Sequence, residues 1–398
     1  MNASGPIFLP KGFKFSSAAA GLKPSGRPDV GLILSRPEAS AAAAVFTKNL
    51  VVAAPVRVGR AALAKSQGRV GAVIVNSGNA NCATGAAGVR NCKTVCAETA
   101  RLLKLPSAEV FPSSTGIIGV PLPVEPLVVQ LESLVAAAGA SADHLRRFSE
   151  AILTTDSKPK LASVPLRSGR GAITGVAKGA GMIHPQLATM LVYLLTDVRA
   201  TPGALQAALE KACDDSFNLI SIDGDTSTND TVLLLASGAS GLRYESVRKE
   251  FDGALLEVCR WLAEQIVADG EGVEHVVRLG IEQAKNRAEA LQVARTIAHS
   301  LLVKTAWAGA DPNWGRILAA VGRSGVSADP KKVSIKIGDQ TVCRGGVACR
   351  FDRQAAHEEL SRPESRVRVK LGRGKAALDF LTSDLTADYV KINADYST

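Results

Sequence analysis

Short apolar runs alternate along the chain with segments that carry apolar residues at helical spacing. Runs bounded by Gly and Pro, which predict buried strands, occupy residues 31–56, 70–75, 110–119, 190–195 and 231–236. Helices are predicted by the 3.6-residue spacing at 89–103, 141–153, 203–214, 247–268 and 291–303. Towards the C-terminus, strict alternation at 333–337 and 367–371 predicts half-buried strands. A chain of 398 residues can bury a large core, and we expect two lobes.

The stretch 175–197 divides at the Ala188–Thr189 bond into a part rich in glycine and a part rich in apolar residues. Before the bond lie a proline and several glycines, which permit positive φ angles and close approach of another group. After it, residues 190–195 form an unbroken apolar run. Thr189 stands at the junction and follows Ala188. This order of a permissive loop, a hydroxyl residue and a buried strand makes Thr189 a candidate nucleophile.

A threonine hydroxyl needs a base beside it to act as a nucleophile. Cleavage of the Ala188–Thr189 bond would supply one, because the new α-amino group has a pKa of about 7.7–8.0. The same pattern is also typical of an ordinary glycine-rich turn before a strand. It does not match a phosphate-binding P-loop or the GxGxxG dinucleotide fingerprint.

Three polar clusters leave a structural and a functional interpretation open. Asn76, Ser77, Asn79 and Asn81 follow the strand at 70–75, and we favour a hydrogen-bonded turn there. SSTGIIG (113–119) has the hydroxyl and backbone donors that an oxyanion hole needs, although it is also a common turn sequence. DGDTSTND (223–230) lacks the EF-hand spacing, so we interpret it as a hydrogen-bonded turn that supports a site.

Composition argues against nucleic-acid-binding, metal-binding and membrane proteins. The net charge is +10, but Lys and Arg are scattered and aromatic residues make up only 4%, so we expect no nucleic-acid binding. Seven cysteines without a disulfide pattern favour a reducing compartment. The five histidines form no metal-binding motif, and we expect no metal site. No signal peptide or membrane span is visible, so we expect a cytoplasmic location and no membrane association.

Eight segments resemble the signatures of one family, the ornithine acetyltransferases, or glutamate N-acetyltransferases, of arginine biosynthesis. In order, they are VNSGNAN (75–81), SSTGIIG (113–119), TTD (154–156), KGAGMIHPQLATML (178–191), DGDTSTND (223–230), DGEG (269–272), GADPNWGRI (309–317) and INADYST (392–398). The resemblance covers essentially the whole chain. It implies an α/β fold, a layered sandwich of two central sheets covered by helices, with a smaller C-terminal α/β lobe.

The resemblance also implies roles for individual residues. The chain cuts itself between Ala188 and Thr189 into an N-terminal chain 1–188 and a C-terminal chain 189–398, whose last third includes the smaller lobe. Thr189 is then the nucleophile, and Thr115 and Gly116 form the oxyanion hole. The implied substrate-binding residues are Thr154, Lys178, Thr189, Glu271, Asn393 and Thr398. Thr155 is an alternative to Thr154, and the sequence departs from the family pattern directly after DGEG, at residues 273–275.

The implied reaction moves an acetyl group from N2-acetylornithine to L-glutamate through an acetyl-threonine intermediate. A covalent intermediate makes a cofactor unnecessary. In bifunctional members acetyl-CoA is a second substrate, and the segments quoted above are compatible with both kinds. The family implies a heterotetramer of two alpha and two beta chains. Two alternatives remain at this point: a self-processing aminopeptidase or amidase of related fold, and a basic binding protein without catalysis.

Overall fold

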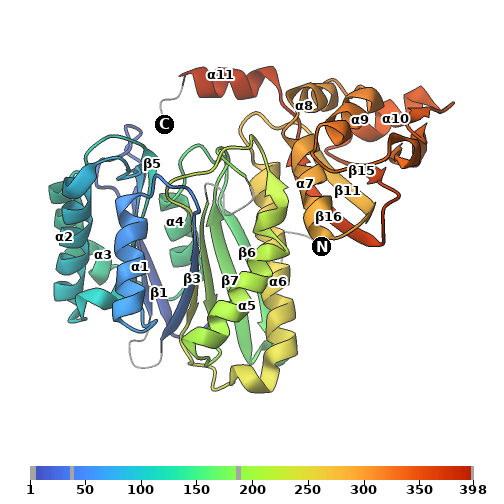
Figure 1. Cartoon of the computed structure of the whole chain (residues 1–398). Coiled ribbons are helices and arrows are strands. Elements are labelled where there is room, and N and C mark those ends of the chain that lie inside the picture. Colours follow the sequence, from blue (N-terminus) through green and yellow to red (C-terminus); the bar gives the residue numbers. More distant parts are fainter. Residues whose placement is uncertain (1–5, 36–39, 185–189, 396–398) are drawn as a thin grey trace.

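The computed structural model describes residues 6–35, 40–184 and 190–395. Two sheets stack face to face in its larger part (Figure 1). The first has the order β1 (Phe13–Ala18), β2 (Val30–Ser35), β4 (Ala72–Asn79), β5 (Val110–Ile117). The second has the order β3 (Ala41–Phe46), β10 (Thr231–Ala236), β8 (Leu191–Thr196), β7 (Gly171–Lys178), β6 (Lys160–Leu166). Most neighbouring strands are antiparallel, while β4 with β5 and β8 with β10 are parallel.

The strands of this sandwich are apolar on both sides because each sheet is covered on both faces. In β8, Tyr193 and Leu195 pack towards the first sheet, whereas Val192 and Leu194 pack towards helices on the opposite face. All four side chains are fully buried. Because both faces of such a strand are buried, its sequence is a continuous apolar run without polar alternation, as predicted for residues 190–195.

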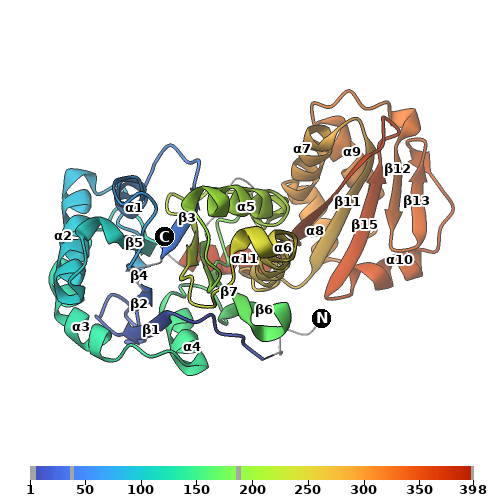
Figure 2. The same cartoon turned by 90° about the horizontal axis from the view of Figure 1, so that it is seen from below.

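Helices form the two outer layers of the sandwich (Figure 2). On the first sheet lie α2 (Gly85–Leu103) and α3 (Val124–Ala136), and on the second lie α5 (Pro202–Asp214) and α6 (Tyr244–Ala268). The sandwich is completed by α1 (Ala54–Lys65) beside β5 and by α4 (Ala142–Ala151), whose Phe148 packs edge-on against Tyr193 between the sheets. Thr201 caps the start of α5, where its side chain accepts the Ala204 N–H.

A third sheet forms the smaller C-terminal lobe. Its order is β14 (Val347–Ala348), β13 (Gln340–Arg344), β12 (Ser334–Ile337), β15 (Glu364–Lys370), β11 (Val276–Ala284), β16 (Ala376–Ser383), β9 (Ile220–Ser221). Its helices are α7 (Arg287–Ala298), α8 (Leu301–Ala308), α9 (Trp314–Gly322) and α10 (Arg353–Leu360). A final helix, α11 (Ala387–Asp395), leaves the lobe and extends back above the sandwich (Figure 1). The predicted α/β sandwich with a smaller C-terminal lobe is therefore confirmed.

Three local predictions were wrong. Residues 54–56 begin α1, with a proline in its first turn, and do not extend a strand. The polar residues Asn76, Ser77 and Asn79 belong to β4, because this strand pairs with β5 as far as Asn79. The helix predicted at 291–303 ends at Ala298, and α8 starts at Leu301 with that side chain 67% exposed.

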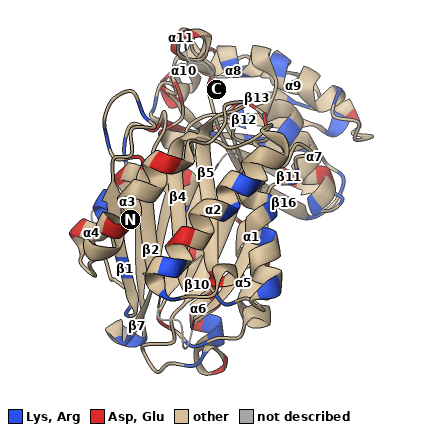
Figure 3. Cartoon of the chain, turned by 90° about the vertical axis from the view of Figure 1, so that its left-hand side faces the viewer, with Lys and Arg blue, Asp and Glu red and all other residues tan. Residues whose placement is uncertain are grey.

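Charged residues of both signs are mixed on the side of the molecule shown in Figure 3, where they occur on the outer helices. This view shows no continuous basic face on that side. In the parts of the chain that the structure describes, no helix combines the length and apolarity needed to cross a bilayer.

The contact between β7 and α6 leads to a test of the packing. A Cβ added to Gly175 would lie 2.6 Å from Leu262 Cδ1 and 2.8 Å from Val258 Cγ1. We predict that Gly175→Ala lowers the free energy of unfolding by about 1–3 kcal/mol, because the core must shift to accept it. Urea denaturation of the two proteins measures this difference.

Gly253, on α6, supplies the matched control. A Cβ at this position would have no atom within 4 Å. Gly253→Ala should therefore raise the free energy of unfolding by about 0.5–1 kcal/mol through helix propensity. Equal effects of the two substitutions would contradict the tight packing of β7 on α6.

Candidate active site

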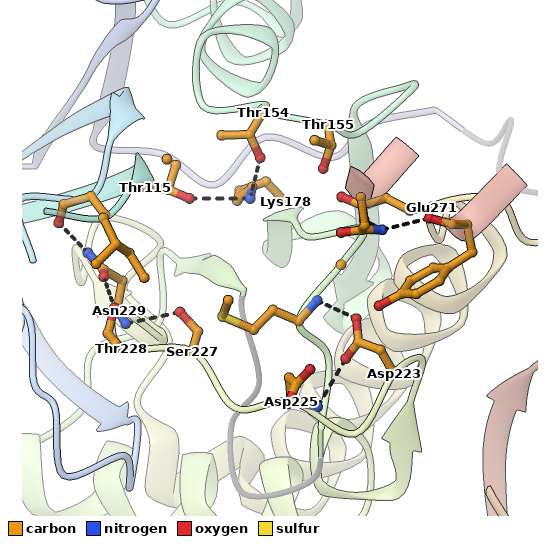
Figure 4. Close-up of a pocket in the computed structure, with 17 residues that line it drawn as sticks. Thr115, Thr154, Thr155, Lys178, Asp223, Asp225, Ser227, Thr228, Asn229 and Glu271 are labelled. Carbon is orange, nitrogen blue, oxygen red and sulfur yellow. Dashed lines mark hydrogen bonds between the residues drawn. The ribbon is translucent and has the colours of Figure 1, made fainter. Parts of the chain in front are cut away.

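A cavity of about 210 Å³ lies at the edge of the sandwich where β5 and β7 end, and two residues of α11 contribute to its wall (Figure 4). Its walls come from segments that are far apart in the sequence. The lining residues are Ala80, Thr115, Gly116, Ile118, Thr154, Thr155, Lys178, Gly181, Met182, Asp223, Asp225, Ser227, Thr228, Asn229, Glu271, Tyr389 and Asn393. Hydroxyl, carboxylate and ammonium groups thus face one small space.

The structure brings together most of the residues predicted to form the site. Thr115, Gly116, Thr154, Lys178, Glu271 and Asn393 all line this cavity, and Thr155 lines it as well. Ala188, Thr189 and Thr398 lie outside the described residues. The convergence supports the choice of residues, while their individual roles stay predictions.

Lys178, the last residue of β7, lies between the two predicted threonines (Figure 4). Its Nζ donates to Thr154 Oγ1 at 2.8 Å and to Thr115 Oγ1 at 3.3 Å. Burial lowers the pKa of Lys178, and the Asp156 carboxylate 3.7 Å away opposes that shift. This ammonium group therefore links the loop after α4 to the strand that carries Thr115.

Asp156 and Lys178 belong to a larger buried ion network that the sequence reading missed. Lys160 Nζ lies 2.6 Å from Asp156 Oδ1 and 2.5 Å from Asp269 Oδ2. Asp156 also accepts the Gly179 N–H at 2.5 Å. Burial alone would raise the pKa of Asp156, but the ammonium groups of Lys178 and Lys160 hold it well below its usual range. Two cations and two anions thus compensate one another beneath the cavity, as buried charges require.

The predicted oxyanion residues sit where β5 runs alongside β4. Gly116 has a φ of +132°, and a Cβ there would lie 2.3 Å from the backbone carbon of Gly78. No other residue fits this close approach of two strands. Ser114, which directly precedes Thr115, donates its hydroxyl to Asn76 Oδ1 at 2.6 Å. Asn76 therefore has a structural role, although it belongs to β4 and not to the predicted turn.

Glu271 meets the C-terminal helix at the rim of the cavity. Its Oε2 accepts from Asn393 Nδ2 at 2.9 Å, and its backbone N–H donates to Ala180 O at 2.9 Å. A Cβ on the next residue, Gly272, would lie 2.3 Å from Tyr389 N. Because Gly272 has no side chain and a φ of +63°, α11 can pass directly over the turn that carries Glu271.

The turn 223–230 supports the cavity as predicted. Asp223 accepts the backbone N–H groups of Met182 and Ile183, at 2.5 and 2.9 Å. Burial raises the pKa of Asp223 to about 6, although these hydrogen bonds favour its charged form. Asp223 and Asp225 also line the cavity and were not singled out from the sequence. The density of carboxylates in DGDTSTND was the signal that could have identified them.

Among the described residues, the side chains of Glu274, His275 and Asp384 form one group close enough to hold a metal ion. Asp384 accepts the backbone N–H groups of Glu274 and His275, and its Oδ2 lies 2.9 Å from His275 Nδ1. These hydrogen bonds account for the cluster as a structural corner that joins the start of β11 to the end of β16. It lies outside the cavity lining.

Comparison with known proteins agrees with the motifs. The model of the ArgJ family matches residues 14–398. The arginine biosynthesis bifunctional protein ArgJ of Chlorobaculum tepidum is 43% identical over 398 residues, which cover 99% of this chain and 98% of that protein. The protein of the same name from Thermus thermophilus is 43% identical over 392 residues, or 98% of this chain and 100% of that protein.

One solved structure among the similar ones is an ornithine acetyltransferase from Mycobacterium tuberculosis in complex with ornithine. It is 33% identical, covers 48% of this chain and 98% of its own, and has a TM-score of 0.44. The family match and the two full-length relatives decide the assignment. This chain belongs to the ArgJ family.

Proposed function

We propose that the protein is a glutamate N-acetyltransferase of arginine biosynthesis, which moves an acetyl group from N2-acetylornithine to L-glutamate. The observation that carries this proposal is the convergence of Thr115, Gly116, Thr154, Lys178, Glu271 and Asn393 on one cavity. The family to which the chain belongs includes full-length relatives named arginine biosynthesis bifunctional proteins, which supports the same reaction. Acetyl-CoA is then a second candidate donor.

In the proposed first half-reaction, the Thr189 hydroxyl attacks the acetyl carbonyl carbon of N2-acetylornithine. The free α-amino group of Thr189 takes the hydroxyl proton and passes it to the leaving α-amine of ornithine. The acetyl group is left as an ester on Thr189. In the second half-reaction the glutamate α-amine attacks this ester, and the Thr189 hydroxyl is restored. No cofactor is needed, because Thr189 carries the acetyl group from the α-amine of ornithine to that of glutamate in two chemically similar steps.

Each tetrahedral intermediate carries a negative oxygen, and we assign its stabilisation to Thr115 and Gly116. The Thr115 hydroxyl accepts from Lys178 Nζ, so it is free to orient its own proton towards an anion. The buried ammonium 3.3 Å away adds a positive field. The cavity edge is therefore electrostatically prepared for an oxyanion.

Donor and acceptor both have an α-carboxylate, but they differ at the far end. Ornithine has a side-chain ammonium there, and glutamate has a second carboxylate. We assign the α-carboxylate to Lys178, with a hydroxyl of Thr154 beside it at 2.8 Å from Nζ. Glu271 and Asn393, which are hydrogen-bonded to each other, supply an acceptor and a donor for the two different ends. Thr398 is proposed to complete the substrate site.

Other parts of the proposal concern processing and assembly. We propose self-cleavage into chains 1–188 and 189–398, assembled as a heterotetramer of two of each. A cytoplasmic location is favoured by the seven cysteines, all of which are free and six of which are buried. The alternative, a self-processing aminopeptidase or amidase, would give acetate and no acetylglutamate from acetylornithine and glutamate, and product analysis separates the two reactions.

The first functional prediction concerns self-cleavage. Purified wild-type protein should give two fragments on a denaturing gel, and N-terminal sequencing should find Thr189 at the start of one. Thr189→Ala should remain a single chain because it has no hydroxyl to attack the preceding carbonyl. Cleavage of Thr189→Ala at the same bond would point to another protease and contradict the proposal.

A second prediction concerns the oxyanion hole. Thr115→Ala should lower kcat by about 10²–10³, because one donor to the negative oxygen is lost. Thr115→Ser keeps the hydroxyl and should retain most of the activity. The measurement is steady-state acetyl transfer by the processed enzyme. An unchanged kcat in a folded Thr115→Ala protein would exclude this role.

A third prediction separates Glu271 from Lys178. Glu271→Gln should slow acetylation of the enzyme by acetylornithine more than its deacetylation by glutamate, whereas Lys178→Met should slow both half-reactions. Loss of one member of a desolvated charge pair costs about 2–5 kcal/mol, or at least about 30-fold in kcat/KM. Single-turnover measurements of the two half-reactions provide the comparison.

Glu274→Gln is the matched control for this experiment. Glu274 lies three residues after Glu271, is exposed and does not line the cavity. Its substitution should leave both half-reactions unchanged. Equal slowing of both half-reactions by Glu271→Gln would remove the proposed contact with the ornithine ammonium.

A further inference from the structure

Two aspartates, the half-buried Asp223 and the buried Asp230, lie at opposite ends of the turn 223–230. They hold the main chain on both sides of the proposed cleavage bond. Before the bond, Asp223 Oδ2 accepts the Met182 N–H at 2.5 Å and Oδ1 accepts the Ile183 N–H at 2.9 Å. After the bond, Asp230 Oδ1 accepts the Met190 N–H at 3.0 Å. One short turn therefore contacts the described residues that flank 185–189 in the sequence.

Backbone hydrogen bonds complete these two attachments. Ile183 O accepts from Ile222 N at 2.9 Å and from Ser221 Oγ at 3.0 Å. Met190 O accepts from Thr231 N at 3.1 Å. The N–H and the C=O of both Ile183 and Met190 are thus bonded to the turn or to its immediate neighbours. The chain is fixed in position and direction at both points.

The same turn also contacts the strand that carries the proposed oxyanion residues. Asn229 Nδ2 donates to Ser114 O at 2.8 Å and to Ala80 O at 2.7 Å. Its Oδ1 accepts from Thr228 Oγ1 at 2.6 Å, which orients the amide. Since Ser114 directly precedes Thr115, the turn sets the distance between β5 and the two flanking attachments. Thr228 and Asn229 themselves line the cavity (Figure 4).

Asp230 holds the main chain at Met190 through one carboxyl oxygen. Its carboxyl group is buried, and Oδ2 has no hydrogen-bond partner among the described residues. Burial raises its pKa well above the usual range, despite the hydrogen bond from Met190 N. Removing a carboxyl group from water costs free energy on folding unless its oxygens are hydrogen-bonded. What Asp230 provides is a fixed position for the backbone of Met190.

We propose that Asp223 and Asp230 are positioning residues for self-cleavage: they hold the chain on both sides of the bond that is cut, in register with the strand that carries Thr115 and Gly116. This inference rests on the proposed self-cleavage. Attack of a hydroxyl on the preceding carbonyl needs precise geometry, and a displacement of about 1 Å can cost about 10²-fold in rate. Two attachments from one turn supply that precision.

The test measures the cleavage rate of full-length chains made in a cell-free translation system, pulse-labelled and followed on denaturing gels. Asp223→Ala and Asp230→Ala should each cleave at least about tenfold more slowly than wild type, because a backbone N–H loses its acceptor. Asp230→Asn keeps the acceptor oxygen and should cleave at nearly the wild-type rate. Asp223→Asn keeps one of two acceptor oxygens, so its cleavage rate should lie between those of wild type and Asp223→Ala.

Asp197 offers a matched control at the other end of β8. It is buried and accepts two backbone N–H groups, from Lys11 and Ala172, each at 3.0 Å. It does not line the cavity. When Asp197→Ala is combined with Thr189→Ala, which keeps the chain uncut, it should lower the thermal unfolding midpoint. As a single substitution it should leave the rate of self-cleavage at the wild-type value. This separates loss of stability from loss of positioning.

Several outcomes would overturn the inference. Wild-type cleavage rates in both alanine variants would do so, and so would equal slowing in Asp197→Ala. If an alanine variant fails to fold, as judged by near-UV circular dichroism, a folded Asp230→Asn protein that does not cleave would exclude the hydrogen-bond role. A wild-type chain that stays uncut under the same conditions would refute self-cleavage itself, and the positioning role with it. In that case all variants would stay uncut, as Thr189→Ala does.

Discussion

The ammonium group of Lys178 is buried, and this constraint organises the site. A buried cation needs a partner, and Asp156 provides it, while Lys160 and Asp269 complete the network around that carboxylate. The four residues come from β6, β7, the loop after α4 and the C-terminal end of α6. Through its contact with Thr115, Lys178 also reaches the first sheet. The cavity edge thus keeps its shape because charges beneath it cannot be separated without a large cost in free energy.

The sandwich explains why the site lies at its edge. Inside the sandwich, both faces of β8 are packed mainly against apolar side chains. At the strand ends, backbone and side-chain groups become available, and the turn 223–230 joins the two sheets through Asn229. The rigid layers therefore position loops that would otherwise move independently, which is the common arrangement for catalytic residues.

The C-terminal lobe takes part in the site through one helix. The chain leaves this lobe after β16 and returns over the sandwich as α11, where Tyr389 and Asn393 reach the cavity. The absence of a side chain at Gly272 permits this close passage. None of the residues of α11 is buried, so its position depends on a few polar contacts at the cavity rim. The site is consequently built from nearly the whole length of the chain.

The sequence by itself determined the apolar strands at 190–195 and 231–236, the helices α2, α4, α5 and α6 and, through its family motifs, six residues that share one cavity. These features depend on the local spacing of apolar residues or on short family motifs, and both can be recognised in the sequence alone. Only the tertiary structure decided that Lys160 and Asp269, 109 positions apart, form an ion pair. It also decided that the helix predicted at 291–303 breaks near His299, whose ring contacts His184 and Ser221 from distant segments. Such pairings arise from the packing of separate elements, and nothing in the local spacing of the residues encodes them.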